Sequence, residues 1–218
     1  MAIIYELHPE TPQAYQVAKI RGALKEGAVI LYPTDTVYAI GCDLNVKSAV
    51  ERVRQIKHMS SDKPLTFLCP SLSNIAAYAQ VSDAAYRLIK RLIPGPYTFL
   101  LPATKLVPKL VMNPKRKTTG IRVPDHAICQ ALLQALGNPI ISTSAPSAIH
   151  SQDTQIPAIE LFNQLDRTVD IIVDDQSPVG YRVSTILDLT EDEPVVLRKG
   201  LGWEAVADLT LIESDAAI

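Results

Sequence analysis

With 218 residues, of which 47% are hydrophobic, the chain can bury the core of one ordinary globular domain without disulfides or metals, and we expect a single domain over residues 1–218. The formal net charge of −2 argues against a surface that coats polyanions generally. There is no basic start followed by an apolar stretch, and no apolar run near the membrane-spanning length of about 18 residues. We therefore expect a soluble, cytoplasmic protein with no membrane partner.

Predicted helices and strands alternate along the chain. Helical periodicity and helix-start residues predict helices, and short apolar, β-branched runs predict strands. In chain order they are a helix over 12–25, a strand over 28–32, a helix over 46–56, a strand over 65–68, a helix over 82–92, strands over 97–101 and 120–123, a helix over 126–136, a strand over 139–143, a helix over 157–164, and strands over 170–173, 184–189 and 195–199. This alternation predicts an α/β fold with a twisted, mixed sheet. Residues 145–156 are the most loop-like stretch, and we expect them to form a mobile cover over a site.

The three cysteines, Cys42, Cys69 and Cys129, lie far apart in the sequence. They form no C-x-x-C pair and have no neighbouring histidine at the spacing of metal ligands. We expect them to be small buried hydrophobic residues in a reducing compartment.

Charge is segregated along the chain. Between Ala84 and Pro124 there is no acid, but there are nine bases: Arg87, Lys90, Arg91, Lys105, Lys109, Lys115, Arg116, Lys117 and Arg122. A basic stretch in a nearly neutral chain indicates a local anionic partner, either a nucleotide or RNA. The alternative is that these bases lie on solvated helix faces. The run over 115–117 favours a partner, because it leads directly into a strand that carries Arg122.

Common phosphate-binding and catalytic motifs are missing. The sequence has no G-x-x-x-x-G-K-[ST], no G-x-G-x-x-G after a strand, no H-E-x-x-H and no G-x-S-x-G. The four histidines are dispersed, so none is expected to be a ligand. We predict no catalytic side chain of these kinds and no metal site, and any nucleotide must be held in another way.

Polar residues at strand ends are the first candidate ligands, because open α/β sheets bind their ligands at such edges. The segment PTDT, Pro33 to Thr36, follows the predicted strand 28–32 and carries two hydroxyls and a carboxylate. It could instead be a capping turn. Lys57, at the end of the helix 46–56, and Lys63, before the strand 65–68, could clamp phosphates as point charges. Alternatively, Lys57 interacts with the helix dipole.

Hydroxyls and arginines near the ends of later strands are the remaining candidates: Thr118, Arg122, Ser142, Ser144, Ser184 and Arg198. Hydroxyls both donate to and accept from a phosphate or a carboxylate. A guanidinium binds the same groups with paired hydrogen bonds. Together these residues predict an anion site with no nucleophile and no obvious general base.

The chain resembles the YrdC/YciO family in seven ordered blocks. They are PTDTVYAIG (33–41), K-x-x-x-x-x-KPL (57–65), PGPYTFLLPATKLVPK (94–109), T-x-G-IRVP (118–124), STSA (142–145), STILDL (184–189) and VLRKG (196–200). The resemblance covers about the whole chain. It implies one YrdC-like domain, with a twisted mixed parallel/antiparallel sheet and flanking helices around a concave basic cavity.

The resemblance also implies threonylcarbamoyl-AMP synthase activity. L-threonine, bicarbonate and ATP would give the adenylate and pyrophosphate, with Mg²⁺ carried by the phosphates. Partner proteins would then transfer the threonylcarbamoyl group to tRNA, forming N6-threonylcarbamoyladenosine. By position, the resemblance assigns L-threonine to Thr34, Arg122, Ser142 and Ser184, with Arg122 pairing with the carboxylate. It assigns ATP to Lys57, Thr118, Ser144, Ser151 and Arg198, and we add Lys63 to this set from its place in the chain.

Four positions depart from the synthase pattern. Met59 replaces the arginine of K-x-R, Leu68 replaces a histidine, Pro146 replaces the asparagine of S-A-N, and Ala39 replaces a glycine. Loss of the arginine removes a phosphate contact of a kind worth about 1.5–3 kcal/mol. These departures resemble the YciO branch and predict a weakly active enzyme.

Two alternatives stay open at this point. The chain could be a non-catalytic protein that binds double-stranded RNA or tRNA through its central basic stretch. It could also be a related adenylate-forming or carbamoyl-handling enzyme with another substrate. RNA-binding modules usually pair basic surfaces with stacking aromatic residues. Aromatic residues are 6% of this chain, and Tyr97 and Phe99 alternate as core residues do, which favours the enzyme.

Overall fold

The structure is a computed structural model that describes residues 1–59, 64–146, 157–209 and 211–212. Its elements follow in the order β1 (Ile3–Glu6), α1 (Ala14–Lys25), β2 (Ile30–Tyr32), β3 (Ala39–Asp43), α2 (Lys47–Ile56), β4 (Thr66–Leu68), α3 (Leu72–Tyr78), α4 (Asp83–Leu92), β5 (Tyr97–Pro102), β6 (Thr118–Arg122), α5 (Ala127–Leu136), β7 (Ile140–Ser144), α6 (Ala158–Leu165), β8 (Ile171–Asp174), β9 (Thr185–Asp188), β10 (Val195–Arg198), the 3₁₀ helix η2 (Trp203–Leu209) and β11 (Leu211–Ile212).

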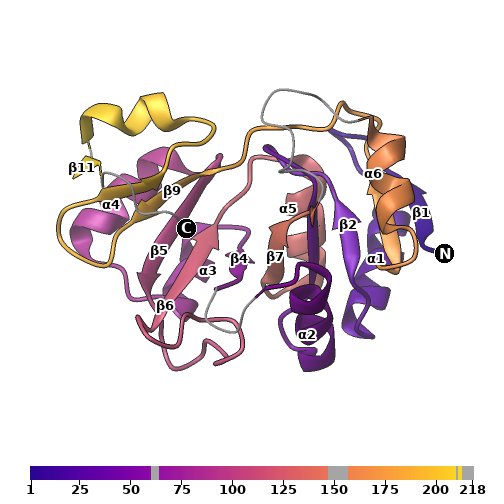
Figure 1. The fold of residues 1–218 in the computed structure, drawn as a ribbon, viewed down its shortest axis with the longest axis horizontal. Helices are drawn as coiled ribbons and strands as arrows, with labels where there is room; N and C mark the ends of the chain where they lie inside the picture. The colour runs from indigo at the N-terminus through magenta and orange to yellow at the C-terminus, as the bar shows by residue number, and fades with distance from the viewer. Residues whose placement is uncertain (60–63, 147–156, 210, 213–218) are drawn as a thin grey trace.

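One mixed sheet runs through the described chain (Figure 1), in the order β1-β8-β2-β3-β7-β4-β6-β5-β9-β10-β11. The pairs β1–β8, β2–β8, β4–β6, β5–β9 and β10–β11 are parallel, and the others are antiparallel. In Figure 1, β4, β5, β6 and β9 lie with α3 and α4 in one half of the molecule. The other half holds β1, β2, β3 and β7 with α1, α2, α5 and α6. The predicted α/β class and mixed sheet are confirmed.

Most predicted elements agree with the structure to within a few residues, but several were missed: β1, β3, α3, η2 and β11. All five residues of β3 are buried, so its sequence lacks the alternation that indicates a half-buried strand. Its Gly41 reflects close packing between strands. A Cβ atom at this position would lie 2.7 Å from the carbonyl oxygen of Ile141. Glycine is therefore required here by the neighbouring backbone.

Helices cover both faces of the sheet. Successive strand residues point to opposite faces, so strands that are apolar throughout place hydrophobic side chains on both of them. In β2, Ile30 and Tyr32 belong to the cluster that packs beneath α1 and α5. Leu31, between them, belongs to the larger cluster, which also contains apolar residues of α2, α3, α4 and α6. Helices α1 and α5 also contact each other. Each predicted amphipathic helix therefore packs its apolar residues against one face of the sheet.

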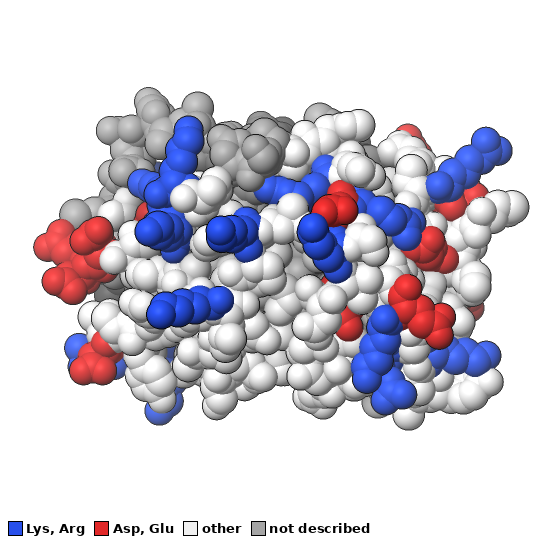
Figure 2. Space-filling view, turned by 90° about the horizontal axis from the view of Figure 1, so that it is seen from below, with Lys and Arg blue, Asp and Glu red and all other residues white. Residues whose placement is uncertain are grey.

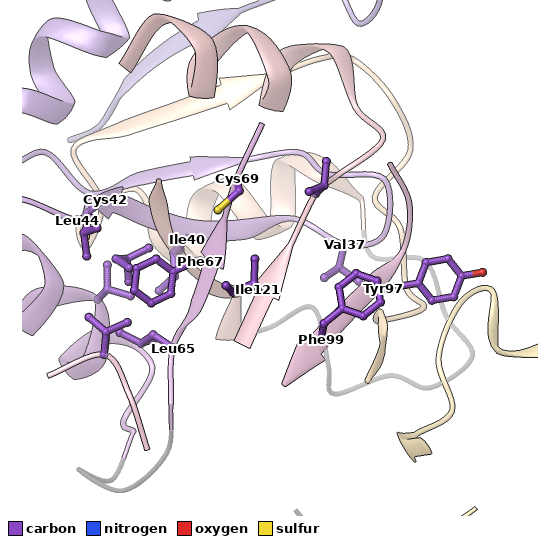
Figure 3. Packing of buried hydrophobic residues seen from close by; sticks show 14 of the residues in the cluster. Val37, Ile40, Cys42, Leu44, Leu65, Phe67, Cys69, Tyr97, Phe99 and Ile121 are labelled. Carbon is purple, nitrogen blue, oxygen red and sulfur yellow. The ribbon is translucent and has the colours of Figure 1, made fainter. Parts of the chain in front are cut away.

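The larger cluster is the main hydrophobic core, and Figure 3 shows its side chains between the strands and helices. Phe67, Phe99 and Ile121 have no exposed surface. Fully burying one such side chain stabilises the fold by about 1.5–3 kcal/mol. Tyr97 stacks on Phe99 with ring centroids 6.4 Å apart, so the prediction that these two aromatics are core residues is confirmed.

The three cysteines are free and buried, as predicted. Burial raises the pKa of Cys42 and of Cys69 to about 12. These thiols therefore stay protonated and unreactive at neutral pH.

Among the described helices, none is both long and apolar enough to cross a membrane.

Candidate functional site

A cavity of about 370 Å³ lies on the face of the sheet that α1 and α5 cover. Ala39 and Leu68 belong to the hydrophobic cluster beneath these helices and also line the cavity. Alternate strand residues line it. In β6, Thr118, Gly120 and Arg122 face the cavity, while the residues between them do not. Strands β3, β4, β5, β7, β9 and β10 supply most of the other walls. The period of the strands therefore determines which side chains can meet a ligand.

The cavity brings together most of the predicted site residues. Seven of them line it: Thr34, Thr118, Arg122, Ser142, Ser144, Ser184 and Arg198. Lys57 lies directly beside it, with Nζ 3.4 Å from Oγ of Ser144. Lys63 and Ser151 lie outside the described residues, as does most of the segment 145–156 that was expected to cover the site.

The lining is positively charged. Arg116, Arg122 and Arg198 contribute guanidinium groups, and the lining contains no aspartate, glutamate, histidine or cysteine in the described part of the chain. The remaining polar groups are mainly serine and threonine hydroxyls. Such a cavity can position and neutralise an anionic ligand, but its described walls offer no ordinary general base.

Arg122 is held by the PTDT turn. Its Nη1 donates to Oγ1 of Thr36 at 2.9 Å, and its Nη2 donates to Oδ1 of Asp35 at 2.6 Å. The side chains of Arg122 and Asp35 are only 8% and 11% exposed. The turn therefore does more than cap the following element, because it orients the guanidinium of a strand distant in sequence. Nε of Arg122 and Oδ2 of Asp35 are buried without a partner.

Hydroxyls beside Arg122 are also fixed by internal hydrogen bonds. Thr34 donates to the carbonyl oxygen of Val37 at 2.7 Å and lies 3.0 Å from Oγ1 of Thr36. Ser142 accepts from the hydroxyl of Tyr32 at 2.6 Å. Burial raises the pKa of Tyr32, so this phenol remains a donor at neutral pH. The donated bond leaves the hydrogen of Ser142 available for another acceptor.

Arg198 forms a second fixed cation in the cavity. Its Nε donates to the carbonyl oxygen of Ser184 at 3.0 Å, and its Nη2 donates to Oγ of Ser184 at 3.1 Å. That hydroxyl also lies 2.9 Å from Oγ1 of Thr98. Burial, followed by the charge of Arg122, lowers the pKa of Arg198 to about 10. An anion between the two arginines would relieve this repulsion.

Lys57 follows the last residue of α2 and extends its side chain to β7. The Nζ atom lies 3.4 Å from Oγ of Ser144 and 3.5 Å from the carbonyl oxygen of Ala145. Burial lowers the pKa of its ammonium group. Among the described residues, neither Lys57 nor Arg198 has a carboxylate partner. Both cations are therefore available for an anionic ligand.

Several cavity residues were not singled out as ligands from the sequence. Arg116 was counted in the basic stretch, and it lines the cavity while forming an ion pair of 3.4 Å with Asp188. Its place in a basic run leading into a strand was the available signal. Thr98 and Asn113 carried no such signal. Of the departures from the synthase pattern, Ala39, Met59 and Leu68 face the cavity.

A buried polar cluster lies at the start of α5. Oδ1 of Asp175 accepts from the hydroxyl of Tyr38 at 3.1 Å, and its Oδ2 lies 3.4 Å from Nε2 of His126. Burial acts to raise the pKa of Asp175, but hydrogen bonds from His126, the Ser177 amide and Tyr38 hold it below its usual value. No group of three or more His, Cys, Asp or Glu residues that could hold a metal occurs in the part of the chain that the structure describes.

Comparisons of sequence relate the chain to proteins of one family. The family model for Sua5, YciO and YrdC, described as "Telomere recombination", matches residues 22–200. The chain is 40% identical over 202 residues to the protein YciO of Escherichia coli strain K12, covering 93% of this chain and 97% of that protein. It is 31% identical over 181 residues to a threonylcarbamoyl-AMP synthase of Vibrio vulnificus strain YJ016, covering 82% and 95% of the two chains.

Solved structures share the fold. The crystal structure of E. coli YciO matches with a TM-score of 0.85 at 40% identity, over 93% of this chain and 97% of that one. The crystal structure of Pyrococcus abyssi Sua5 complexed with L-threonine matches with a TM-score of 0.82 at 28% identity. That match covers 97% of this chain and 63% of Sua5.

Proposed function

Because this chain belongs to the Sua5/YciO/YrdC family, we propose that its cavity binds L-threonine and ATP and forms threonylcarbamoyl-AMP from them and bicarbonate, at a low rate. The synthase of V. vulnificus supports the reaction, and the threonine complex of P. abyssi Sua5 supports the amino acid. The adenylate would serve tRNA modification, with partner proteins transferring the threonylcarbamoyl group to form N6-threonylcarbamoyladenosine.

The observation that carries this proposal is the lining of the cavity. Three arginines and many hydroxyls converge there from strands far apart in sequence, with no carboxylate among the described lining residues. ATP, bicarbonate and the carboxylate of threonine are all anionic. A reaction that joins anions needs their charges neutralised and their reacting atoms aligned.

L-threonine would bind at Arg122, which lines the cavity. The guanidinium would pair with the substrate carboxylate, since it is already oriented by Asp35 and Thr36. Hydroxyls of Thr34, Ser142 and Ser184 would complete the site.

ATP would lie along the other cations. Arg198 and Lys57 would contact its phosphates, together with the hydroxyls of Thr118 and Ser144, which also line the cavity. Lys63 and Ser151 belong to the same proposed set. Mg²⁺ on the triphosphate would neutralise phosphate charge, and it would be held mainly by phosphate oxygens and water.

The chemistry proceeds in two balanced steps. The threonine ammonium and bicarbonate give the N-carboxylate, water and a proton. A carboxylate oxygen then attacks the α-phosphorus of ATP, the bond to the bridging oxygen breaks, and pyrophosphate leaves with its electron pair. The side chains supply position and charge, which is the kind of catalysis that this lining can provide.

A low rate is expected because Met59 and Leu68 place apolar side chains on the cavity wall. Neither can hydrogen-bond to a phosphate or to threonine. A missing hydrogen bond to a charged group is worth about 1.5–3 kcal/mol, or roughly a ten- to hundredfold loss if it acts in the transition state.

The test is incubation with L-threonine, bicarbonate and ATP labelled in the α-phosphate, with the adenylate separated from AMP. We expect slow, threonine-dependent adenylate formation. Arg198→Ala should weaken ATP binding at least about tenfold in calorimetry. Arg87→Ala is the control, because Arg87 is an exposed arginine on α4. Equal ATP affinity in both variants would remove Arg198 from the site, and adenylate formation without threonine dependence would indicate another substrate.

A second candidate function is RNA binding. Apart from Arg122, the bases of the stretch from Ala84 to Pro124 are exposed, and those of 105–117 lie in one connecting segment. Figure 2 shows lysine and arginine side chains gathered across the middle of the lower face of the molecule. We expect salt-sensitive, weakly sequence-selective binding to structured RNA, measured by filter retention at increasing salt. Absence of binding at low salt would leave the stretch as a solvated surface.

A further inference from the structure

Of the three arginines that line the cavity in the described chain, Arg116 alone has no part in the proposed function. Its side chain is 60% exposed, whereas that of Arg122 is 8% exposed. Arg116 therefore lies at the mouth of the cavity, and Arg122 lies deeper within it.

The directions of the strands place Arg116 beside the residues proposed to bind ATP. Strands β4 and β6 run parallel, and β7 runs antiparallel to β4. The segments that precede β4 and β6 therefore meet the end of β7 at one edge of the sheet. Met59 precedes β4, Arg116 precedes β6, and Ser144 ends β7, and all three line the cavity. Lys57 lies at this edge as well, 3.4 Å from Ser144.

A tight turn fixes the backbone from which Arg116 extends. The amide of Asn113 donates to the carbonyl oxygen of Thr118, and the amide of Lys117 donates to the carbonyl oxygen of Asn113, each at 2.9 Å. The side chain of Asn113 accepts from the amides of Lys115 and Arg116, also at 2.9 Å. Lys115 is exposed and does not line the cavity. The turn thus presents one of two neighbouring cations to a ligand.

The guanidinium of Arg116 has donors available for that ligand. Within the described chain its side chain makes one hydrogen bond, from Nη1 to Oδ2 of Asp188 at 3.4 Å. Exposed ion pairs of this kind are weak, and Asp188 lies outside the lining of the cavity. The other N–H groups can therefore form the paired hydrogen bonds that a phosphate accepts.

We propose that Arg116 binds the two outer phosphates of ATP and then the pyrophosphate that leaves. In the proposed reaction the α-phosphorus lies next to threonine, deep in the cavity at Arg122. The outer phosphates extend from there to the mouth, where Arg116 neutralises the charge that develops on the leaving group. The identity of the ligand as ATP rests on the proposed function, whereas the contact of Arg116 with a pyrophosphate group does not.

The experiment measures binding of pyrophosphate, ATP and AMP by calorimetry. We expect Arg116→Ala to bind pyrophosphate and ATP at least about tenfold more weakly than the parent. AMP lacks the outer phosphates and should bind equally to both. Arg116→Lys keeps the charge but not the planar fork, so its affinity for pyrophosphate should be intermediate.

Lys115→Ala is the matched control, because it removes the same charge from an exposed side chain of the same turn. It should bind all three ligands as the parent does. Equal pyrophosphate affinity in Arg116→Ala and Lys115→Ala would overturn the proposal. An equal loss of AMP binding in Arg116→Ala would also overturn it, because Arg116 would then act on the cavity as a whole.

A second substitution separates phosphate contact from a structural role. Met59→Arg adds a guanidinium at the same edge of the cavity, so it should restore most of the pyrophosphate affinity that Arg116→Ala loses. Loss without recovery would contradict a shared phosphate site. If the parent binds pyrophosphate but forms no adenylate, the proposed function fails, and the comparison of Arg116→Ala with Lys115→Ala still decides the role of Arg116. A parent that binds neither pyrophosphate nor ATP would refute both.

Discussion

Two adjacent rows of residues cross the same three strands and have opposite surroundings. Phe67 of β4 lies in register with Ile121 of β6 and Ile141 of β7, and all three are buried in the main core. One residue earlier, Thr66 lies in register with Gly120 and Ser142, and these three line the cavity. Figure 3 shows Phe67 and Ile121 side by side in the first row.

The two rows teach that packing and ligand contact are divided between the faces of one sheet. Both rows lie on the same three hydrogen-bonded strands, so the backbone positions the residues of each row equally well. Substitutions in the first row should change stability, and substitutions in the second should change binding. The following experiments test how completely the two rows can be separated.

The largest effect is expected from the packed row. Phe67→Ala removes a ring with no exposed surface that also stacks on Tyr78, with centroids 5.3 Å apart. We expect the free energy of unfolding to fall by about 3–5 kcal/mol, measured by urea denaturation. Thr66→Ala, its neighbour on the cavity side, should change it by less than about 1 kcal/mol. Similar losses in both variants would break the comparison.

The next effect concerns the cavity row. A Cβ atom at Gly120 would meet its nearest neighbours at 3.4–3.5 Å, which is ordinary contact, so Gly120→Val should fold while filling part of the cavity. We expect threonine and ATP binding to become too weak to detect by calorimetry. Thr119→Val is the matched control, because Thr119 is fully buried on the other face and its Oγ1 has no partner. That variant should bind normally and be as stable as the parent or more so. Normal binding by Gly120→Val would show that the ligand lies elsewhere.

A smaller effect is expected where the cavity wall is apolar. Met59→Arg adds a guanidinium to the lining, and we expect pyrophosphate release to rise roughly tenfold. Leu68→His could add a contact to threonine and should raise the rate further in the double variant. Release is compared in the parent, both single variants and the double variant. A parent that already turns over as fast as a synthase would contradict the role given to Met59, and a silent double variant would indicate another substrate.

The smallest effect concerns a polar contact beside the packed core. The pKa of Asp175 in the folded protein lies below its usual value, so its ionised carboxylate stabilises the fold. This stabilisation is fully present above the unfolded pKa of about 3.9 and is lost as pH falls from there through the lower pKa of the folded protein. We expect Asp175→Asn to lower the free energy of unfolding by about 1 kcal/mol at pH 7. The difference from the parent should shrink below about pH 4. Urea denaturation at pH 7, 5 and 3.5 measures this, and a constant difference would exclude the ionised carboxylate as its source.

The periodic elements were predictable because their pattern is local. Residues 97–101 and 120–123 were correctly placed in strands from their apolar, β-branched character, and the helix over 82–92 corresponds to α4 within one residue. Strand β3 was missed because full burial removes alternation. Its position between β2 and β7 depends on packing that includes residues about a hundred positions away.

The candidate site was predictable in its residues but not in its charge balance. Thr118, Arg122 and Ser142 were identified from their places in or near predicted strands and from family blocks. The pairing of Arg122 with Asp35 could not be read from either, because it joins side chains 87 positions apart in the sequence. Arg116 was missed for a similar reason, since only the fold shows which members of a basic run turn toward a cavity.

The order of the strands also determines when the cavity can exist during biosynthesis. Strand β5 is synthesised near the middle of the chain, whereas its parallel neighbour β9 is synthesised much later. Arg198 lies at the end of β10, the strand that follows β9. Until then, a nascent chain carries Thr34 and Arg122 but has one wall missing and the edge of β5 unpaired. Unpaired strand edges invite association with other chains, and non-local pairing slows folding. The cavity is therefore complete only after the last strands have left the exit tunnel, and no ligand that needs both Arg122 and Arg198 can stabilise the chain before then.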